Sequence, residues 1–135
     1  QDTRGPAAHP DAELDEAQVA SLHARLLEER ARLRALAEAQ RASMLGAQLG
    51  APDEMDAADA ELALATGLGA RAHVSADLSA IELALAKLAL AQYGLCEETQ
   101  EPIGYPRLRA RPWARYAVTA QESIEHAERA RRARR

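Results

Sequence analysis

The sequence predicts an all-α protein: a long antiparallel coiled-coil hairpin, a small globular knob and a C-terminal helix. Three observations carry this prediction. Alanine occupies 33 of the 135 positions and leucine 18, and both residues favour helix. Aromatic residues make up 3% of the chain and phenylalanine is absent, which argues against a sheet protein. Apolar residues recur at helical spacing in two stripes that a short turn separates.

The same composition limits the class of protein. Alanine buries little area, and at about 25 cal/mol per Å² this gives long, thin packing seams without a roomy substrate pocket. An enzyme is therefore not expected. No apolar run reaches the ~20 residues of a membrane span, and we expect neither a membrane contact nor a secretory signal. The single cysteine, Cys96, excludes an intrachain disulfide and fits a reducing, cytoplasmic location.

The first part of the chain is expected to be a flexible lead over residues 1–14. A coiled-coil hairpin follows over residues 15–92. Its first helix starts at the N-cap Asp15 and ends near Leu49, because Gly50-Ala51-Pro52 stops a helix. The apolar stripe of this helix has heptad-like spacing and consists of Val19, Leu22, Leu26, Leu33 and Leu36.

The second helix of the hairpin is expected to start between Asp53 and Asp56 and to run to about Tyr93. Gly67 and Gly69 each cost about 1 kcal/mol relative to alanine inside a helix, which predicts a kink or a softer segment there. Two long helices joined by a short turn should pair back on each other, with the tip of the hairpin at residues 50–58. The clearest stripe of the second helix is Leu78, Ile81, Leu85 and Leu88.

The last third of the chain has a different amino-acid composition. Residues 93–118 are rich in proline, glycine and aromatic side chains, and they predict a small irregular knob. A capping box from Thr119 to Glu122 then starts a final helix within residues 119–135. Residues 1–96 carry a net charge of −7 and residues 97–135 one of +3. The tail contributes five arginines, which suit a helix C-terminus or, as a weaker alternative, DNA: Arg129, Arg131, Arg132, Arg134 and Arg135.

The turn between the two long helices is strongly acidic. Helix capping with a solvated acidic surface is one explanation of this cluster. A catalytic carboxylate pair does not fit, because the tip of a hairpin cannot exclude water. A calcium loop does not fit either, because the ligand alternation and the central glycine are missing. The remaining interpretation is an acidic probe that a partner reads, made of Asp53, Glu54, Asp56, Asp59 and Glu61.

Three regions resemble the DksA/TraR family over about residues 14–128, and the first is Glu16-Ala-Gln-Val-Ala20 at the start of the coiled-coil arm. The knob has the zinc-finger motifs of that family in Tyr93-Gly-Leu-Cys96, Ile103-Gly104 and Arg107-Leu-Arg-Ala-Arg111-Pro112, and the turn Asp53-Glu-Met-Asp56-Ala-Ala58 matches its DxxDxA tip. The family's zinc ligands are spaced C-x2-C-x17-C-x2-C. Because a structural zinc needs four ligands, we expect a zinc-independent member without a metal cofactor. The four positions hold one surviving ligand, and they are Cys96, Thr99, Ala117 and Ala120.

The resemblance implies a function as well as a fold. Members of this family bind RNA polymerase with the coiled coil inserted through the secondary channel, and they alter promoter open complexes. They repress stable-RNA promoters and help to activate some others. By this analogy the residues that act at the tip are Asp53, Asp56 and Ala58. The protein would be a monomer without enzymatic activity and without sequence-specific DNA binding.

The resemblance also bears on the alarmone guanosine tetraphosphate, which in this family lies between the factor and polymerase. Arg111 matches one of the contacting positions. Other such positions hold Asp77, Ala80 and Gln121, so much of the positive charge is missing. We therefore expect a weak or absent response to the nucleotide. Two alternatives stay open: a coiled-coil adaptor that has lost polymerase binding, and a DNA-binding protein that uses the arginine tail.

Overall fold

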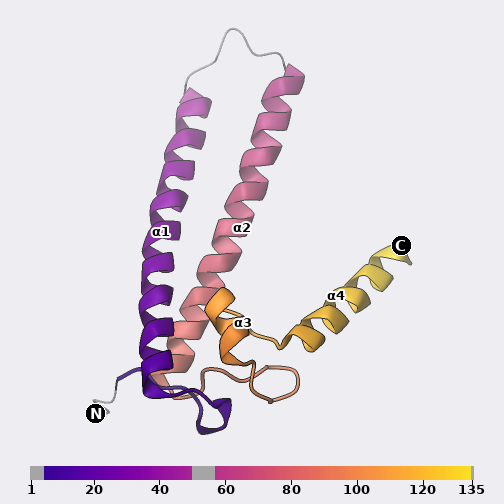
Figure 1. Ribbon diagram of the computed structural model, residues 1–135. Coiled ribbons are helices and arrows are strands. Elements are labelled where there is room, and N and C mark those ends of the chain that lie inside the picture. The colour runs from indigo at the N-terminus through magenta and orange to yellow at the C-terminus, as the bar shows by residue number, and fades with distance from the viewer. Residues whose placement is uncertain (1–4, 50–56, 135) are drawn as a thin grey trace. The chain divides into compact units, whose positions relative to one another are not determined.

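The computed structural model of the protein describes residues 5–49 and 57–134, and these residues are mostly helical (Figure 1). A short 3-10 helix, η1, precedes four α-helices. The described ranges contain two isolated β-bridges and no longer strand. The prediction of an all-α protein is confirmed. The elements are η1 (Pro10–Ala12), α1 (Glu16–Leu49), α2 (Ala57–Ala89), α3 (Tyr105–Ala110) and α4 (Val118–Ala133).

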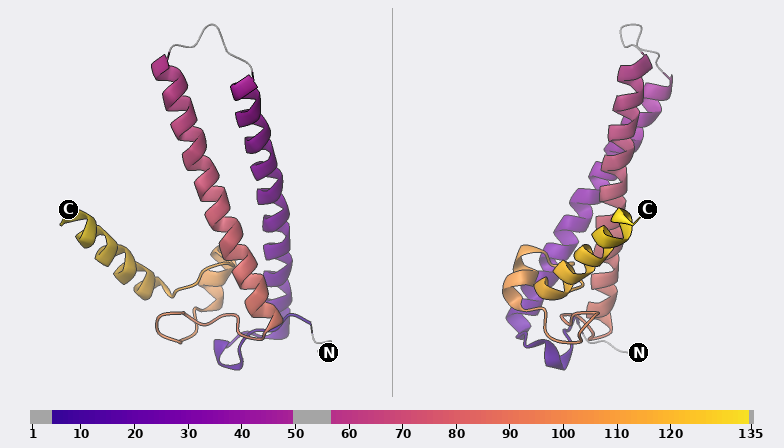
Figure 2. Two further views of the ribbon diagram at one scale, coloured as in Figure 1. Left: turned by 180° about the vertical axis from the view of Figure 1, so that it is seen from behind. Right: turned by 90° about the vertical axis from the view of Figure 1, so that its right-hand side faces the viewer.

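The chain divides into two compact units. The first unit comprises Gln1–Leu27 and Ala80–Arg135, and the second comprises Glu28–Ser79. Within each unit, one stretch of α1 lies beside a stretch of α2 that runs in the opposite direction (Figures 1 and 2). The first unit adds η1, α3, α4 and their connecting loops to its helix pair.

The core of the first unit lies where the two apolar stripes meet the knob. Leu22 and Leu26 of α1 and Ile81 and Leu88 of α2 are at most 1% exposed. These are positions that the heptad-like spacing assigned to the helix interface. The knob adds large side chains to the same core, and those buried almost completely are Tyr93, Cys96, Leu108 and Pro112.

The second unit has a thinner core. Its buried hydrophobic residues, among those described, are Leu33 and Val74, whereas Leu36 of the predicted stripe is 38% exposed. A contact between the Arg71 guanidinium and the Met44 sulfur at 3.2 Å also joins the two helices. The packing seam is therefore long and narrow, as the alanine content indicated.

Two predicted helix features differ in outcome. The start of α1 is confirmed, because the Asp15 carboxylate accepts a 2.7 Å hydrogen bond from the Gln18 amide nitrogen and the Gln18 side chain accepts one from the Asp15 amide nitrogen. The capping box from Thr119 to Glu122 is wrong. Helix α4 begins earlier, with Ala117 as its N-cap and no side-chain capping bond, so both residues lie inside the helix.

For residues 5–14 the structure differs from the expected flexible lead, whereas residues 1–4 of that lead lie outside the described residues. Within the first unit, residues 5–14 pack against the end of α2 and the turn after it, where the backbone amide nitrogens of Ala7 and His9 donate to the carbonyls of Leu88 and Tyr93. Ala12 of η1 is 1% exposed. The order of this segment comes from these tertiary contacts, and proline content alone does not reveal them.

Helix α2 continues through Gly67 and Gly69 without interruption, because helix on both sides carries the chain across the two costly positions. The softer segment expected there stays a prediction. The helix ends at Ala89, earlier than the expected Tyr93, because Ala91 adopts a left-handed conformation with φ 55°. The tip of the hairpin lies largely outside the described residues.

Candidate functional site

A tight turn carries the chain from α2 into the knob. After Ala91 has ended the helix, Gly94 adopts a φ of 104°, which favours glycine. A Cβ atom at this position would lie 2.6 Å from the Cβ of Ala12. The residue at position 94 therefore has to be small as well as permissive, and this turn sets the direction of the loop that contains Cys96.

The loop and the start of α4 bring most of the four predicted zinc positions together. Cys96 is fully buried, and its sulfur accepts hydrogen bonds from the Thr99 hydroxyl and from the backbone N–H of Ala117. Ala117 is the N-cap of α4, and Ala120 is 7% exposed in the first turn of that helix. Two segments that are far apart in sequence thus meet at a single sulfur.

These side chains do not fit a structural zinc ion. The four positions supply one thiol, one hydroxyl and two methyl groups, whereas structural zinc takes four ligands from Cys, His or carboxylate. In residues 5–49 and 57–134, no group of three or more His, Cys, Asp or Glu side chains is arranged to hold a metal ion. The family resemblance therefore indicates the position of a zinc site that the side chains present there cannot form.

The surroundings of the Cys96 thiol still favour its ionised form. Burial raises its pKa, but hydrogen bonds from the Thr99 hydroxyl and from the backbone N–H groups of Ala117, Thr99 and Glu98 outweigh burial and leave the pKa below its ordinary value. In metal sites, hydrogen bonds of this kind orient and tune the coordinating groups. Here the hydrogen bonds surround the Cys96 sulfur, and the described residues supply no cluster of further metal ligands around it.

A cluster of charged residues crosses the same region, and the sequence did not predict it. The Arg115 guanidinium holds the Glu97 carboxylate through two hydrogen bonds of 2.7 and 2.8 Å, and Lys87 of α2 adds a third at 2.7 Å. We call Lys87, Glu97 and Arg115 the Glu97 cluster. The bonds from Arg115 lower the pKa of Glu97, burial opposes them and Lys87 reinforces them, so that the pKa is about 2.

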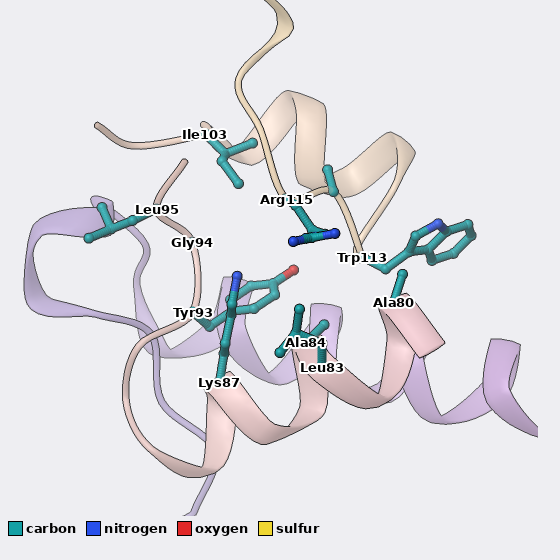
Figure 3. Close-up of a pocket in the computed structure, with 11 residues that line it drawn as sticks. Ala80, Leu83, Ala84, Lys87, Tyr93, Gly94, Leu95, Ile103, Trp113 and Arg115 are labelled. Atoms are coloured by element: carbon teal, nitrogen blue, oxygen red, sulfur yellow. The ribbon is translucent and has the colours of Figure 1, made fainter. Parts of the chain in front are cut away.

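The two cations of this cluster come from different elements. Figure 3 shows Lys87 on α2 and Arg115 after α3 pointing toward one another beside the ring of Tyr93. The cavity between them measures about 10 Å³, roughly the size that one water molecule needs. The sequence does contain a signal for this cluster. Glu97 directly follows the former ligand position Cys96, and Arg115 lies two residues before the former ligand position Ala117.

A second pocket of about 210 Å³ lies on the first unit and is both basic and aromatic. Its guanidinium groups stand over rings, with Arg111 5.7 Å from the Trp113 centroid and Arg115 5.4 Å from the Tyr116 centroid. The side-chain nitrogens Arg107 Nε and Trp113 Nε1 are buried and, within the described chain, have no hydrogen-bond partner. The pocket includes three of the alarmone-related positions, namely Ala80, Arg111 and Gln121, but not Asp77.

The hairpin tip is described only in part. Asp53 and Asp56 lie outside the described residues, whereas Ala58 is exposed in the first turn of α2. At the other end of the chain, Arg129, Arg131, Arg132 and Arg134 are exposed around α4. None of the helices in the described ranges has the length and apolar character needed to cross a bilayer.

These features define a class: a helical protein with two long helices and a small knob in which a single buried thiol joins two loops. The family model for the prokaryotic dksA/traR C4-type zinc finger matches residues 91–126. The solved structure of transcription factor DksA2 from Pseudomonas aeruginosa is 36% identical in sequence, with a TM-score of 0.73 over 87% of this chain and 91% of that one. The chain belongs to the DksA/TraR family.

Curated relatives agree with this assignment. The RNA polymerase-binding transcription factor DksA of Caulobacter vibrioides (strain NA1000 / CB15N) is 44% identical over 80 residues, which are 59% of this chain and 56% of that protein. General stress protein 16O of Bacillus subtilis (strain 168) is 44% identical over 48 residues, 36% of this chain and 29% of its own. The chain thus spans little more than half the length of the first of these relatives.

Proposed function

We propose that this protein is a transcription regulator that binds RNA polymerase and makes or breaks no covalent bond itself. The observation that carries the proposal is the structural match to a transcription factor over 91% of that factor's chain and 87% of this one. Helix α1 alone has 34 residues, about 50 Å at 1.5 Å per residue, which is long enough to reach into a narrow channel. We propose the secondary channel of polymerase as the route.

In this proposal the tip residues Asp53, Asp56 and Ala58 act on polymerase. Two carboxylates on a small turn can accept charge-assisted hydrogen bonds from mobile basic elements, and an alanine allows close approach. The factor would shift the populations of promoter open complexes, repressing stable-RNA promoters and activating some others. Exposure of Ala58 in the first turn of α2 is compatible with this role.

Purified polymerase tests the proposal directly. The Asp56→Asn variant should co-purify with polymerase as the unaltered protein does, yet lose repression of a ribosomal promoter. Asp59→Asn is the matched control, because it removes a charge from the same acidic cluster outside the tip motif, and it should retain repression. Failure of the unaltered protein to bind polymerase would favour the adaptor alternative.

We also propose that the knob acts without zinc. The support is chemical, because one thiol cannot hold a structural zinc ion and the aligned positions offer no second sulfur. Repression should therefore survive a chelator. One equivalent of zinc in the purified protein would contradict the proposal.

For guanosine tetraphosphate we propose a weak or absent response. Arg111 lines the basic pocket, but the neighbouring positions Ala80 and Gln121 bring no charge, and Arg115 is already paired with Glu97. In a transcription assay, adding the nucleotide should therefore increase repression only slightly, and Arg111→Ala should change little. Full potentiation by the nucleotide would overturn this part of the proposal.

A further inference from the structure

In a four-cysteine finger, the metal joins two loops that are far apart in sequence. The knob of this protein has to join the same two loops by other means. Here they are the loop of Cys96 and Thr99 and the segment that leads into α4 at Ala117. The first loop closes on itself, because the Cys96 amide donates to the Glu101 carbonyl and the Gln100 amide to the Cys96 carbonyl, both at 2.8 Å. Those bonds do not connect it to the second segment.

One link between the two segments is the hydrogen bond that the Cys96 sulfur accepts from the Ala117 backbone N–H, and further links run through position 97. The Glu97 backbone amide donates a 2.9 Å hydrogen bond to the Arg115 carbonyl, so the two segments already touch at the main chain. The side chains of the same two residues then form a bidentate pair. Because the guanidinium fork matches a carboxylate geometrically, this pair fixes the orientation of the loops as well as their distance.

Lys87 extends the link to a third element. Its ammonium group reaches the Glu97 carboxylate from α2, so one carboxylate holds a helix, a loop and the segment before α4. The side chains of Lys87 and Glu97 are 20% and 28% exposed, and that of Arg115 is 46% exposed. A lone exposed ion pair contributes little, but a network with bidentate geometry and partial burial is the exception.

We infer that the Glu97 carboxylate replaces the metal ion as the cross-link of the knob, with Arg115 and Lys87 as its ligands. The arrangement inverts the chemistry of the metal site, because an anion on the first loop binds one cation from the segment before α4 and one from α2. This inference rests on the proposed absence of zinc. It does not depend on polymerase binding.

A double-mutant cycle on the full chain tests the inference. Trp113 is the single tryptophan and lines the cavity beside Arg115, so its fluorescence reports the knob, whereas far-ultraviolet circular dichroism reports the helices. Glu97→Gln and Arg115→Gln should each lower the folding equilibrium constant of the knob by about fivefold to thirtyfold. The double variant should lose little more than Glu97→Gln alone, because that substitution already removes the interaction with Arg115.

Matched controls keep the result interpretable. Glu98→Gln removes a neighbouring exposed carboxylate and should leave the fluorescence transition unchanged. Should Glu97→Gln fail to fold, Arg115→Lys keeps the charge and loses the fork, and it should give a smaller loss than Arg115→Gln. Single variants without effect, or fully additive effects, would overturn the inference. Zinc found in the unaltered protein would instead overturn the proposal on which it rests, and metal analysis separates the two outcomes.

Discussion

The hydroxyl group of Tyr93 donates a 2.6 Å hydrogen bond to the backbone carbonyl of Pro112, and both residues are buried. This bond spans 19 positions in sequence and connects the turn after α2 with the chain that leaves α3. Burial raises the pKa of the Tyr93 hydroxyl, a nearby Arg25 opposes this weakly, and the group therefore stays a proton donor throughout the physiological range. The knob is thus held by a neutral bond at Tyr93 and a charged cluster at Glu97.

Tyr93→Phe should destabilise the knob by about 1–3 kcal/mol, because the variant leaves the buried Pro112 carbonyl without its donor while keeping the aromatic ring. Urea unfolding followed by Trp113 fluorescence measures the loss. Tyr105→Phe, at a half-exposed position of α3, is the control and should cost much less. Equal stability of the Tyr93→Phe variant and the unaltered protein would show that the bond makes no net contribution.

Replacing glycine with alanine should change the stability of the protein in opposite directions at Gly94 and Gly69. Gly94→Ala should destabilise the protein by about 1–3 kcal/mol, since alanine at φ 104° is strained and its Cβ would clash with Ala12. Gly69→Ala should stabilise α2 by up to about 1 kcal/mol, because no atom lies within 4 Å of an added Cβ. Thermal unfolding of the two variants by circular dichroism compares them. A lower melting temperature for Gly69→Ala would show that the glycine has a role the packing does not reveal.

The long helices could be predicted because their signals are local. Leucine spacing located the buried positions Leu22, Leu26 and Leu88, and Asp15 with its partner marked the start of α1. The order of residues 5–14 could not be predicted in this way, because it depends on contacts with a segment some 80 residues away. The predicted capping box of α4 was wrong because the helix has its N-cap at Ala117, which makes no side-chain capping bond.

The candidate site shows the same division. The family resemblance identified Cys96, Thr99, Ala117 and Ala120 as former ligand positions, and the structure places Thr99 and Ala117 beside the sulfur of Cys96. The Glu97 cluster escaped prediction because acids and bases are frequent in this chain and spacing does not show which of them meet. A pair of opposite charges that flanks two lost ligand positions is a pattern that a sequence search can use.

The Glu97 cluster makes the knob sensitive to acid. The pKa of Glu97 is about 2 in the folded protein, below the value near 4.3 expected when unfolded. A depressed pKa gives stability that is complete above the unfolded value and disappears as the pH falls toward 2. The pKa of Arg115 is raised by its hydrogen bonds to Glu97, so this partner stays charged in that window. The other titratable side chains that line the cavity beside Lys87 and Glu97 are His9 and Cys96.

The measurement is a comparison of two proteins, because other carboxylates also titrate in acid. The difference in folding stability between the unaltered protein and Glu97→Gln, followed by Trp113 fluorescence, should be constant from pH 7 to about pH 5 and shrink below pH 4. A difference that persists unchanged at pH 2.5 would assign the effect of the substitution to packing and not to charge.

Restoring the lost ligands should restore metal binding. The triple variant Thr99→Cys, Ala117→Cys and Ala120→Cys places three sulfurs next to Cys96, whose sulfur already accepts hydrogen bonds from the first two of these positions. One zinc ion per chain is expected, because four thiolates complete a tetrahedral site. Metal analysis after gel filtration measures the stoichiometry, with the unaltered protein as the control.

The same variant makes the two cross-links interchangeable. With zinc bound, the metal joins the two loops, so adding Glu97→Gln to the triple variant should cost much less than it costs in the unaltered protein. Removing the zinc with a chelator should bring the full cost back. If the triple variant takes up no zinc, the four positions have drifted too far apart for one ion. If it takes up zinc and Glu97→Gln remains as costly as before, the carboxylate has a task in the knob that differs from that of the metal.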